Sequence, residues 1–422
     1  MQNRQLNLGM LYLLMVPIGA ALVHFLDFSI GNFRFSGWLW MMYFLAGAFL
    51  FQAEIALNRQ SRVDFPWLAW LPWVAYLWMS LTWCDGLAQR NIQDAMQITV
   101  PLSIAVVASM FGRRLEHLRL YITAIVVTLV ILLVRVAMIR LHIIVDEDRT
   151  GARIFSITAV FLASVAVALT HVKPTRGYLM WAACLAVAAG TGSRTTTGVI
   201  LLLPVLNPLN RNWMVKGTLL GATCLAGIGL FYTPQFQQRF FYDGHGTLTQ
   251  LVQGDFLSFG RFEAWPAIFA KAQEHAWFGA GVGEVTEFVP TVWPEEDKPH
   301  NDYLRLFFET GIIGFTLFWS TMYWQYRNAV RRALATDGLL RAGFGAAALG
   351  IIGFAILCLT DNVLIYNLYY NNMLFGMLGL CYGVAAASAN GLTNSPETVT
   401  SKLTQSPVLP TPWAQQIGGG AS

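Results

Sequence analysis

The stretch R-L-Y-I-T-A-I-V-V-T-L-V-I-L-L-V-R-V-A-M-I, from Arg119 to Ile139, is an apolar run of the length that crosses a lipid bilayer as a helix. Many similar runs surround it, because 55% of all residues are hydrophobic, only 12% are charged and the mean hydropathy is +0.50. Soluble globular domains do not have this composition. The sequence therefore predicts an all-α polytopic membrane protein.

Long apolar runs separated by charges or by Gly and Pro clusters predict about twelve spans. The first of them is interpreted as a retained span and not as a signal peptide, because only Arg4 precedes it and no small-residue cleavage site follows it. The spans are expected near residues 7–26, 37–57, 66–83, 95–111, 119–139, 154–171, 177–191, 196–207, 214–232, 303–325, 342–359 and 364–388.

Positive charges gather in alternate connections, which predicts that these connections face the cytoplasm. The polar segment after Asn390 lies on the same side and has the composition of a disordered tail. Both termini are therefore expected in the cytoplasm. The residues that set this orientation are Arg59, Arg62, Arg113, Arg114, Arg119, Lys173, Arg176, Arg211, Lys216, Arg327, Arg331, Arg332 and Arg341.

The chain is expected to divide into four parts. Residues 1–232 form the first group of membrane helices, and residues 303–389 form the last. Between them, residues 233–302 form one long external loop, which is rich in Gly near Gly281 and is expected to contain short helices, one of them over Phe262–Glu274. Residues 390–422 form the cytoplasmic tail.

The external face carries basic residues that topology does not explain, namely Arg149, Arg153, Arg194 and Arg261, and its long loop ends at His300. Arginine is always protonated and its planar fork binds phosphate oxygens in pairs. Histidine accepts a proton near neutral pH. Together these residue types suit a site that stabilises a departing pyrophosphate while it activates a hydroxyl group.

The motif H-N-D-Y-L-R-L-F-F-E-T-G-I-I-G, from His300 to Gly314, resembles the H-N-x-x-L-x-x-x-x-E-x-G-x-x-G signature of the O-antigen ligase and polymerase superfamily. The order of the spans, with a long external loop ahead of the motif, is similar over residues 7–388. The resemblance implies a GT-C-like glycosyltransferase in the bacterial inner membrane, with its active site on the periplasmic side.

The resemblance also implies roles for individual residues. His300 would be the catalytic base, with Asn301 beside it. Arg194, in an S-R motif, and Arg261, in a G-R-x-x-x-W motif, would bind the pyrophosphate. Arg153 is a third candidate, although the I-F-S-I-T-A-V that follows it departs from the family pattern.

The spacing of the residues after His300 has a structural interpretation as well. Arg305 and Glu309 are one helical turn apart and are expected to pair within the membrane, while Gly311 and Gly314 are expected to allow close helix packing. The acidic residues 295–297 have no ligand spacing and are interpreted as a solvated loop, so neither a metal nor another cofactor is expected.

The implied reaction is the transfer of an O-antigen polysaccharide from undecaprenyl pyrophosphate to the lipid A core oligosaccharide, by metal-independent inverting glycosyl transfer. The expected partners are these two substrates and membrane lipid, and not nucleic acid. An O-antigen polymerase and a protein O-oligosaccharyltransferase of the same superfamily remain alternatives. A lipid or glycan transporter is a more distant one, because the spans lack the acidic and histidine relays typical of transporters.

Overall fold

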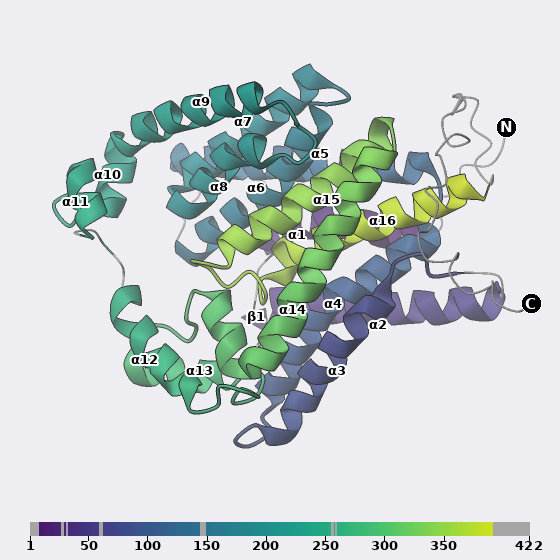
Figure 1. The fold of residues 1–422 in the computed structure, drawn as a ribbon, viewed down its shortest axis with the longest axis horizontal. Coiled ribbons are helices and arrows are strands. Elements are labelled where there is room, and N and C mark those ends of the chain that lie inside the picture. The colour runs from purple at the N-terminus through teal and green to yellow at the C-terminus, as the bar shows by residue number, and fades with distance from the viewer. Residues whose placement is uncertain are drawn as a thin grey trace, which may run out of the picture.

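The structure is a computed structural model that describes residues 8–26, 29–30, 33–58, 62–143, 149–254, 257 and 260–390. Most of the described residues are helical (Figure 1). The tail expected over residues 390–422 lies, from residue 391 onward, outside the described residues.

The first part of the chain is a series of long helices joined by short turns. Two antiparallel strands of two residues each, β1 (Ser29–Ile30) and β2 (Phe33–Arg34), lie between the first two helices. The elements are α1 (Leu8–Leu26), α2 (Phe35–Leu57), the 3-10 turn η1 (Trp67–Trp70), α3 (Leu71–Met79), the 3-10 turn η2 (Ser80–Trp83), α4 (Gln89–Phe111), α5 (Leu115–Arg140), α6 (Arg149–Leu169), α7 (Pro174–Thr191), α8 (Arg194–Leu206) and α9 (Trp213–Phe231).

Four short helices follow, and Figure 1 shows them as two separate pairs, one at the left and one at the lower left. They are α10 (Pro234–Phe240), α11 (Leu248–Gln253), α12 (Arg261–Gln273) and α13 (Val285–Val292). Helix α12 confirms the helix expected over Phe262–Glu274 within one residue at each end.

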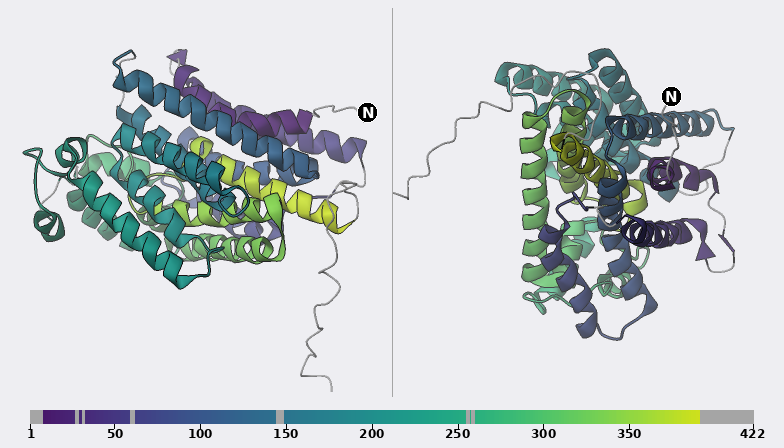
Figure 2. Two further views of the ribbon diagram at one scale, coloured as in Figure 1. Left: turned by 90° about the horizontal axis from the view of Figure 1, so that it is seen from above. Right: turned by 90° about the vertical axis from the view of Figure 1, so that its right-hand side faces the viewer.

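The last part contains α14 (Asp302–Ala335), α15 (Gly338–Leu357), the 3-10 turn η3 (Asn367–Tyr369) and α16 (Asn371–Ala389). The span expected to begin at residue 364 was wrong at its start, because the chain forms turns before α16 begins at Asn371. The two views in Figure 2 show the long helices packed into one bundle.

Within the part of the chain that the structure describes, six helices are long and apolar enough to cross a membrane. They are the helices over Leu39–Leu57, Gln89–Phe111, Leu115–Arg140, Trp213–Phe231, Gly338–Leu357 and Asn371–Ala389. Shorter apolar helices lie at Leu8–Val23, Ile154–Leu169 and Arg194–Leu206. The class predicted from composition, a helical membrane protein, is therefore confirmed.

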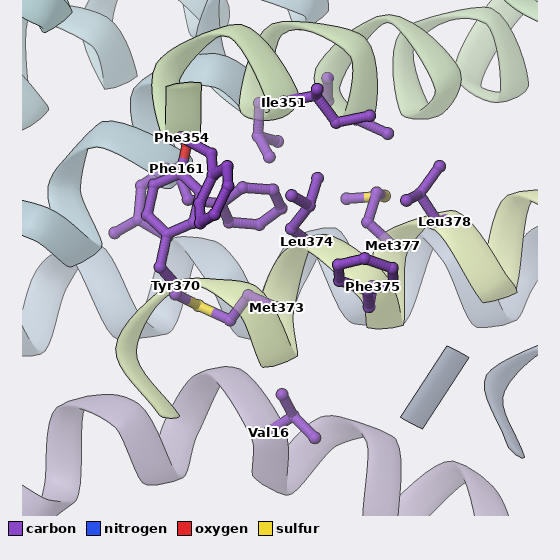
Figure 3. Close-up of a cluster of buried hydrophobic side chains, with 14 of the residues drawn as sticks. Val16, Phe161, Ile351, Phe354, Tyr370, Met373, Leu374, Phe375, Met377 and Leu378 are labelled. Carbon is purple, nitrogen blue, oxygen red and sulfur yellow. The ribbon is translucent and has the colours of Figure 1, made fainter. Parts of the chain in front are cut away.

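Helix α16 lies at the centre of the bundle, where most of its side chains are buried. Figure 3 shows the apolar cluster that it forms with α15 and α6, in which Leu374 lies near Phe161 and Ile351. A Cβ atom at Gly379 would lie 2.2 Å from the carbonyl oxygen of Ala105 on α4. Only glycine allows the two backbones to approach so closely, as is typical of helix packing in membranes.

Helix α14 is kinked at Gly311, which has φ +59° and ψ −170°. At the kink its free backbone groups bind the segment after α12: Ala280 N donates to Phe308 O at 2.8 Å, and Ile312 N donates to Ala276 O at 2.8 Å. The hydroxyl of Tyr76 on α3 donates to Phe278 O at 3.0 Å and to Thr310 O at 3.1 Å. Hydrogen bonds thus hold the segment that follows α12 against α3 and α14.

Candidate functional site

His300 lies directly before α14 in a backbone conformation that non-glycine residues rarely adopt. Its φ is +51°, and its side chain is only 5% exposed. Such strain persists only where surrounding contacts enforce it, and it is found mostly at functional sites. The ring of Trp293 stands edge-on to the imidazole, with 5.8 Å between the ring centroids.

Both nitrogens of the His300 ring have partners. Nε2 lies 2.9 Å from Oε2 of Glu296, and Nδ1 lies 2.6 Å from Nδ2 of Asn362. When the Asn362 amide donates to Nδ1, the ring proton is on Nε2 and is donated to Glu296. A carboxylate on one nitrogen and an amide on the other fix the orientation of the ring.

Asn301, the expected companion of His300, is the N-cap of α14. Its side-chain oxygen accepts a hydrogen bond from Leu304 N at 3.0 Å. This contact satisfies one of the free backbone donors at the helix start. The amide that reaches the imidazole belongs to Asn362 and not to Asn301.

Asp302 connects the histidine segment to the turn that carries Asn362. Its Oδ2 accepts from Leu364 N at 2.8 Å, and its backbone N–H donates to Cys358 O at 2.8 Å. Asp302 and Asn362 are both fully buried. The turn after α15 is thereby held against the start of α14, and this places the Asn362 amide on the ring.

Arg194 is the first residue of α8 and contacts the long loop. Its guanidinium lies over the ring of Phe240, 4.6 Å from the centroid, and its two terminal nitrogens are each 3.5 Å from Leu257 O. The next residue, Thr195, accepts a hydrogen bond from the Thr360 hydroxyl at 3.0 Å. Because Thr360 is two positions before Asn362, the start of α8 lies on the same side of the bundle as His300.

Arg261 is the first residue of α12, which begins beside the histidine segment. The indole Nε1 of Trp265 donates to Pro299 O, directly before His300, at 2.7 Å. A Cβ atom at Gly260 would lie 2.9 Å from Nε1 of Trp293, so the start of the helix packs on the same tryptophan as His300. Leu257 is only three positions before Gly260 and can lie at most roughly 11 Å from it. The loop thus brings Arg194 and Arg261 to the region of His300.

Arg153 lies in the first turns of α6, and its side chain is outside the described residues. Its relation to the other arginines is therefore open. Helix α8, which begins at Arg194, has 13 residues. At a rise of 1.5 Å per residue this is about 20 Å, less than the hydrocarbon thickness of a bilayer.

The expected pair between Arg305 and Glu309 is confirmed, with 3.1 Å between Nε and Oε1. The sequence interpretation missed a third member, Asp94 on α4, whose Oδ2 lies 2.7 Å from Nη2 of Arg305. The side chains of Arg305 and Glu309 are each 1% exposed. This network joins α14 to α4 one turn after His300 and serves the structure of the site.

The glycine-rich segment beyond α12 packs against the start of α4. Asn91 donates to Val282 O at 2.7 Å and to Oε1 of Glu284 at 3.0 Å. Burial raises the pKa of the Glu284 carboxyl, and the hydrogen bond from Asn91 partly offsets this effect. Burial and nearby carboxylates also raise the pKa of the neighbouring Cys84 thiol to about 11, so the thiol stays protonated at neutral pH.

Asn362 and Glu296 are the two site residues that sequence reasoning did not assign a role. Glu296 is predicted only as part of the solvated acidic run 295–297, and Asn362 has no predicted role. The available signal was weak: Asp361 and Asn362 interrupt an otherwise apolar region. Nothing in the local pattern shows which of several external turns faces the histidine.

The fold and the site together define a helical membrane protein with a constrained histidine and two arginines at one end of its bundle. Residues 178–319 match the family model described as O-Antigen ligase, and this range contains Arg194, Arg261 and His300. The match confirms the resemblance to the O-antigen ligase and polymerase superfamily that the His300 motif indicated. No curated protein matches the chain.

Proposed function

We propose that this protein is an O-antigen ligase, which transfers an O-antigen polysaccharide from undecaprenyl pyrophosphate to the lipid A core oligosaccharide. The main observation in support of the proposal is the buried His300 ring. It is held between Glu296 and Asn362, and it lies next to the start of α12, which begins at Arg261. The match to the O-antigen ligase model supports the same reaction class.

The proposed topology has about twelve crossings, with both termini in the cytoplasm and residues 233–302 in the periplasm. Contacts at the two ends of the bundle agree with it. At the proposed cytoplasmic end, Arg113 donates to Arg62 O at 3.1 Å. At the proposed periplasmic end, Arg140 on α5 donates to Gly190 O at 2.8 Å, close to Arg194. The bacterial inner membrane is the proposed location.

His300 acts in this mechanism as the general base. The acceptor hydroxyl takes the place of Glu296 at Nε2, because Glu296 is the more exposed of the two ring partners, at 37% against a fully buried Asn362. Nε2 must then be free of its proton. The Asn362 amide supports that tautomer by turning its oxygen, which has no hydrogen-bond partner among the described residues, toward Nδ1–H.

The bond changes balance without an added reactant. The hydroxyl proton moves to Nε2, the hydroxyl oxygen forms the new bond to the anomeric carbon, and the bond from that carbon to the pyrophosphate oxygen breaks. The pyrophosphate leaves with the electron pair on the opposite face, so the anomeric configuration inverts. Arg194 and Arg261, with Arg153 as a third candidate, stabilise its negative charge, and Glu296 stabilises the imidazolium.

The test is a transfer assay with purified protein, undecaprenyl-pyrophosphate-linked glycan and lipid A core, run with and without EDTA. We expect glycan on lipid A in both conditions, and loss of transfer in His300→Ala. His245→Ala is the matched control, because His245 is an exposed histidine of the same loop. Lengthening of the glycan on the polyprenyl carrier would instead identify a polymerase, and transfer to a protein would identify an oligosaccharyltransferase.

A further inference from the structure

A cavity of about 450 Å³ lies at the far end of α12 from Arg261. Its lining residues are Trp83, Asp85, His275, Phe278, Gly279 and Ala280. Helix α12 has 13 residues and is therefore about 20 Å long, so the cavity is well separated from the proposed pyrophosphate site. Its volume is within the range of roughly 300–1,000 Å³ typical of small-molecule sites.

The wall of the cavity is rigid. Gly279 has φ +78°, and a Cβ atom there would lie 2.3 Å from the carbonyl oxygen of Glu309. The following residues are bound to α14 by the backbone hydrogen bonds at its kink, and Tyr76 holds Phe278 O. A preformed wall loses little entropy when a ligand binds.

The lining has the chemistry of a saccharide site. The rings of Trp83 and Phe278 lie 6.5 Å apart at 74°, and an aromatic face accepts the C–H groups on one face of a sugar ring. Asp85 and His275 supply hydrogen-bonding groups for hydroxyls. The buried Nε1–H of Trp83 has no hydrogen-bond acceptor among the described residues.

The charge of the lining excludes another class of ligand. None of the six lining residues is Lys or Arg, and Asp85 is acidic. A phosphate or a carboxylated sugar would be repelled here, in contrast to the region of Arg194 and Arg261. We therefore infer that this cavity is a second saccharide subsite, which binds a neutral or amino sugar of one of the two glycans several units away from the bond that forms. This inference rests on the proposed transferase function.

The inference is tested with full-length protein in detergent. Asp85→Ala and His275→Ala remove polar lining groups, and Trp83→Phe removes the indole N–H but keeps an aromatic ring. Trp277→Ala is the control, because Trp277 neighbours Phe278 in the sequence, is 69% exposed and does not line the cavity. Melting temperatures of all variants identify any that fail to fold.

The first measurement is the KM of each substrate in the transfer assay. We expect the lining variants to raise the KM for one glycan by about tenfold, with little change in kcat, while Trp277→Ala leaves both unchanged. A higher KM for lipid A core assigns the subsite to the acceptor, and a higher KM for the polyprenyl-linked glycan assigns it to the donor. Unchanged KM values for both substrates would overturn the inference.

The second measurement does not depend on transfer. Saturation-transfer NMR detects binding of two probes, released core oligosaccharide and released O-antigen glycan, to wild type and to Asp85→Ala. Loss of a binding signal in the variant supports the subsite even if wild type transfers nothing, in which case only the proposed function fails. Absence of binding to wild type, or equal binding to both proteins, contradicts the subsite.

Discussion

The side-chain amide of Asn362 lies 2.6 Å from Nδ1 of His300, although the two residues are 62 positions apart in the chain. The contact exists because Asp302, two positions after the histidine, accepts a hydrogen bond from Leu364 N, two positions after the asparagine. Two short segments therefore form one unit, and the proposed catalytic base is oriented by a turn between α15 and α16.

Replacement of Asn362 by Ala should lower kcat on the order of a hundredfold, because the ring would lose the partner that fixes its orientation. The rate of glycan transfer by purified protein measures the effect. Asn362→Asp keeps an oxygen that accepts from Nδ1–H and should retain more activity than the alanine variant. Equal activities of wild type and Asn362→Ala would show that the contact has no part in the reaction.

Replacement of Glu296 by Gln should reduce kcat by about tenfold, because the variant keeps the size of the side chain but loses the negative charge that stabilises the imidazolium. Glu295→Gln is the matched control: it removes the same charge from the adjacent position. If both variants slow transfer to the same extent, the general charge of the loop is responsible, and the contact between Glu296 and His300 is not.

Replacement of Arg305 by Leu should destabilise the protein by about 3–5 kcal/mol, because Asp94 and Glu309 would remain buried without their cation. Thermal unfolding in detergent measures the loss. Arg331→Leu, an exposed position on the same helix, should unfold within a degree or two of wild type. An Arg305→Leu variant that melts with wild type would contradict a structural role for the network.

Replacement of Gly311 by Ala should lower stability by about 1–2 kcal/mol or more, because alanine is strained at positive φ. Its Cβ atom would also lie 2.4 Å from Trp277 O. Gly217→Ala on α9 is the control, since a Cβ atom there meets nothing within 4 Å. The melting temperatures of the two variants, measured side by side, separate the effect of the kink from a general effect of losing glycine.

Much of the site could be predicted from the sequence because it depends on local patterns. Apolar runs predicted the helical membrane class, the residues around Phe262 predicted α12, and the one-turn spacing predicted the pair of Arg305 with Glu309. The resemblance implied a place for Asn301 beside His300, and in the structure its side-chain oxygen caps α14. The amide that contacts the ring belongs to Asn362, which is 62 positions away and which no local pattern indicates.

The sequence by itself determined that the chain is a helical membrane protein and which motif holds its histidine, because hydrophobicity, helical period and motif spacing are properties of short segments. The tertiary structure decided that Asn362 orients His300, that Asp94 completes the Arg305 network, and that Trp83, Asp85 and Phe278 line one cavity. These residues are far apart in the chain, and only the packing of the bundle fixes which turns meet.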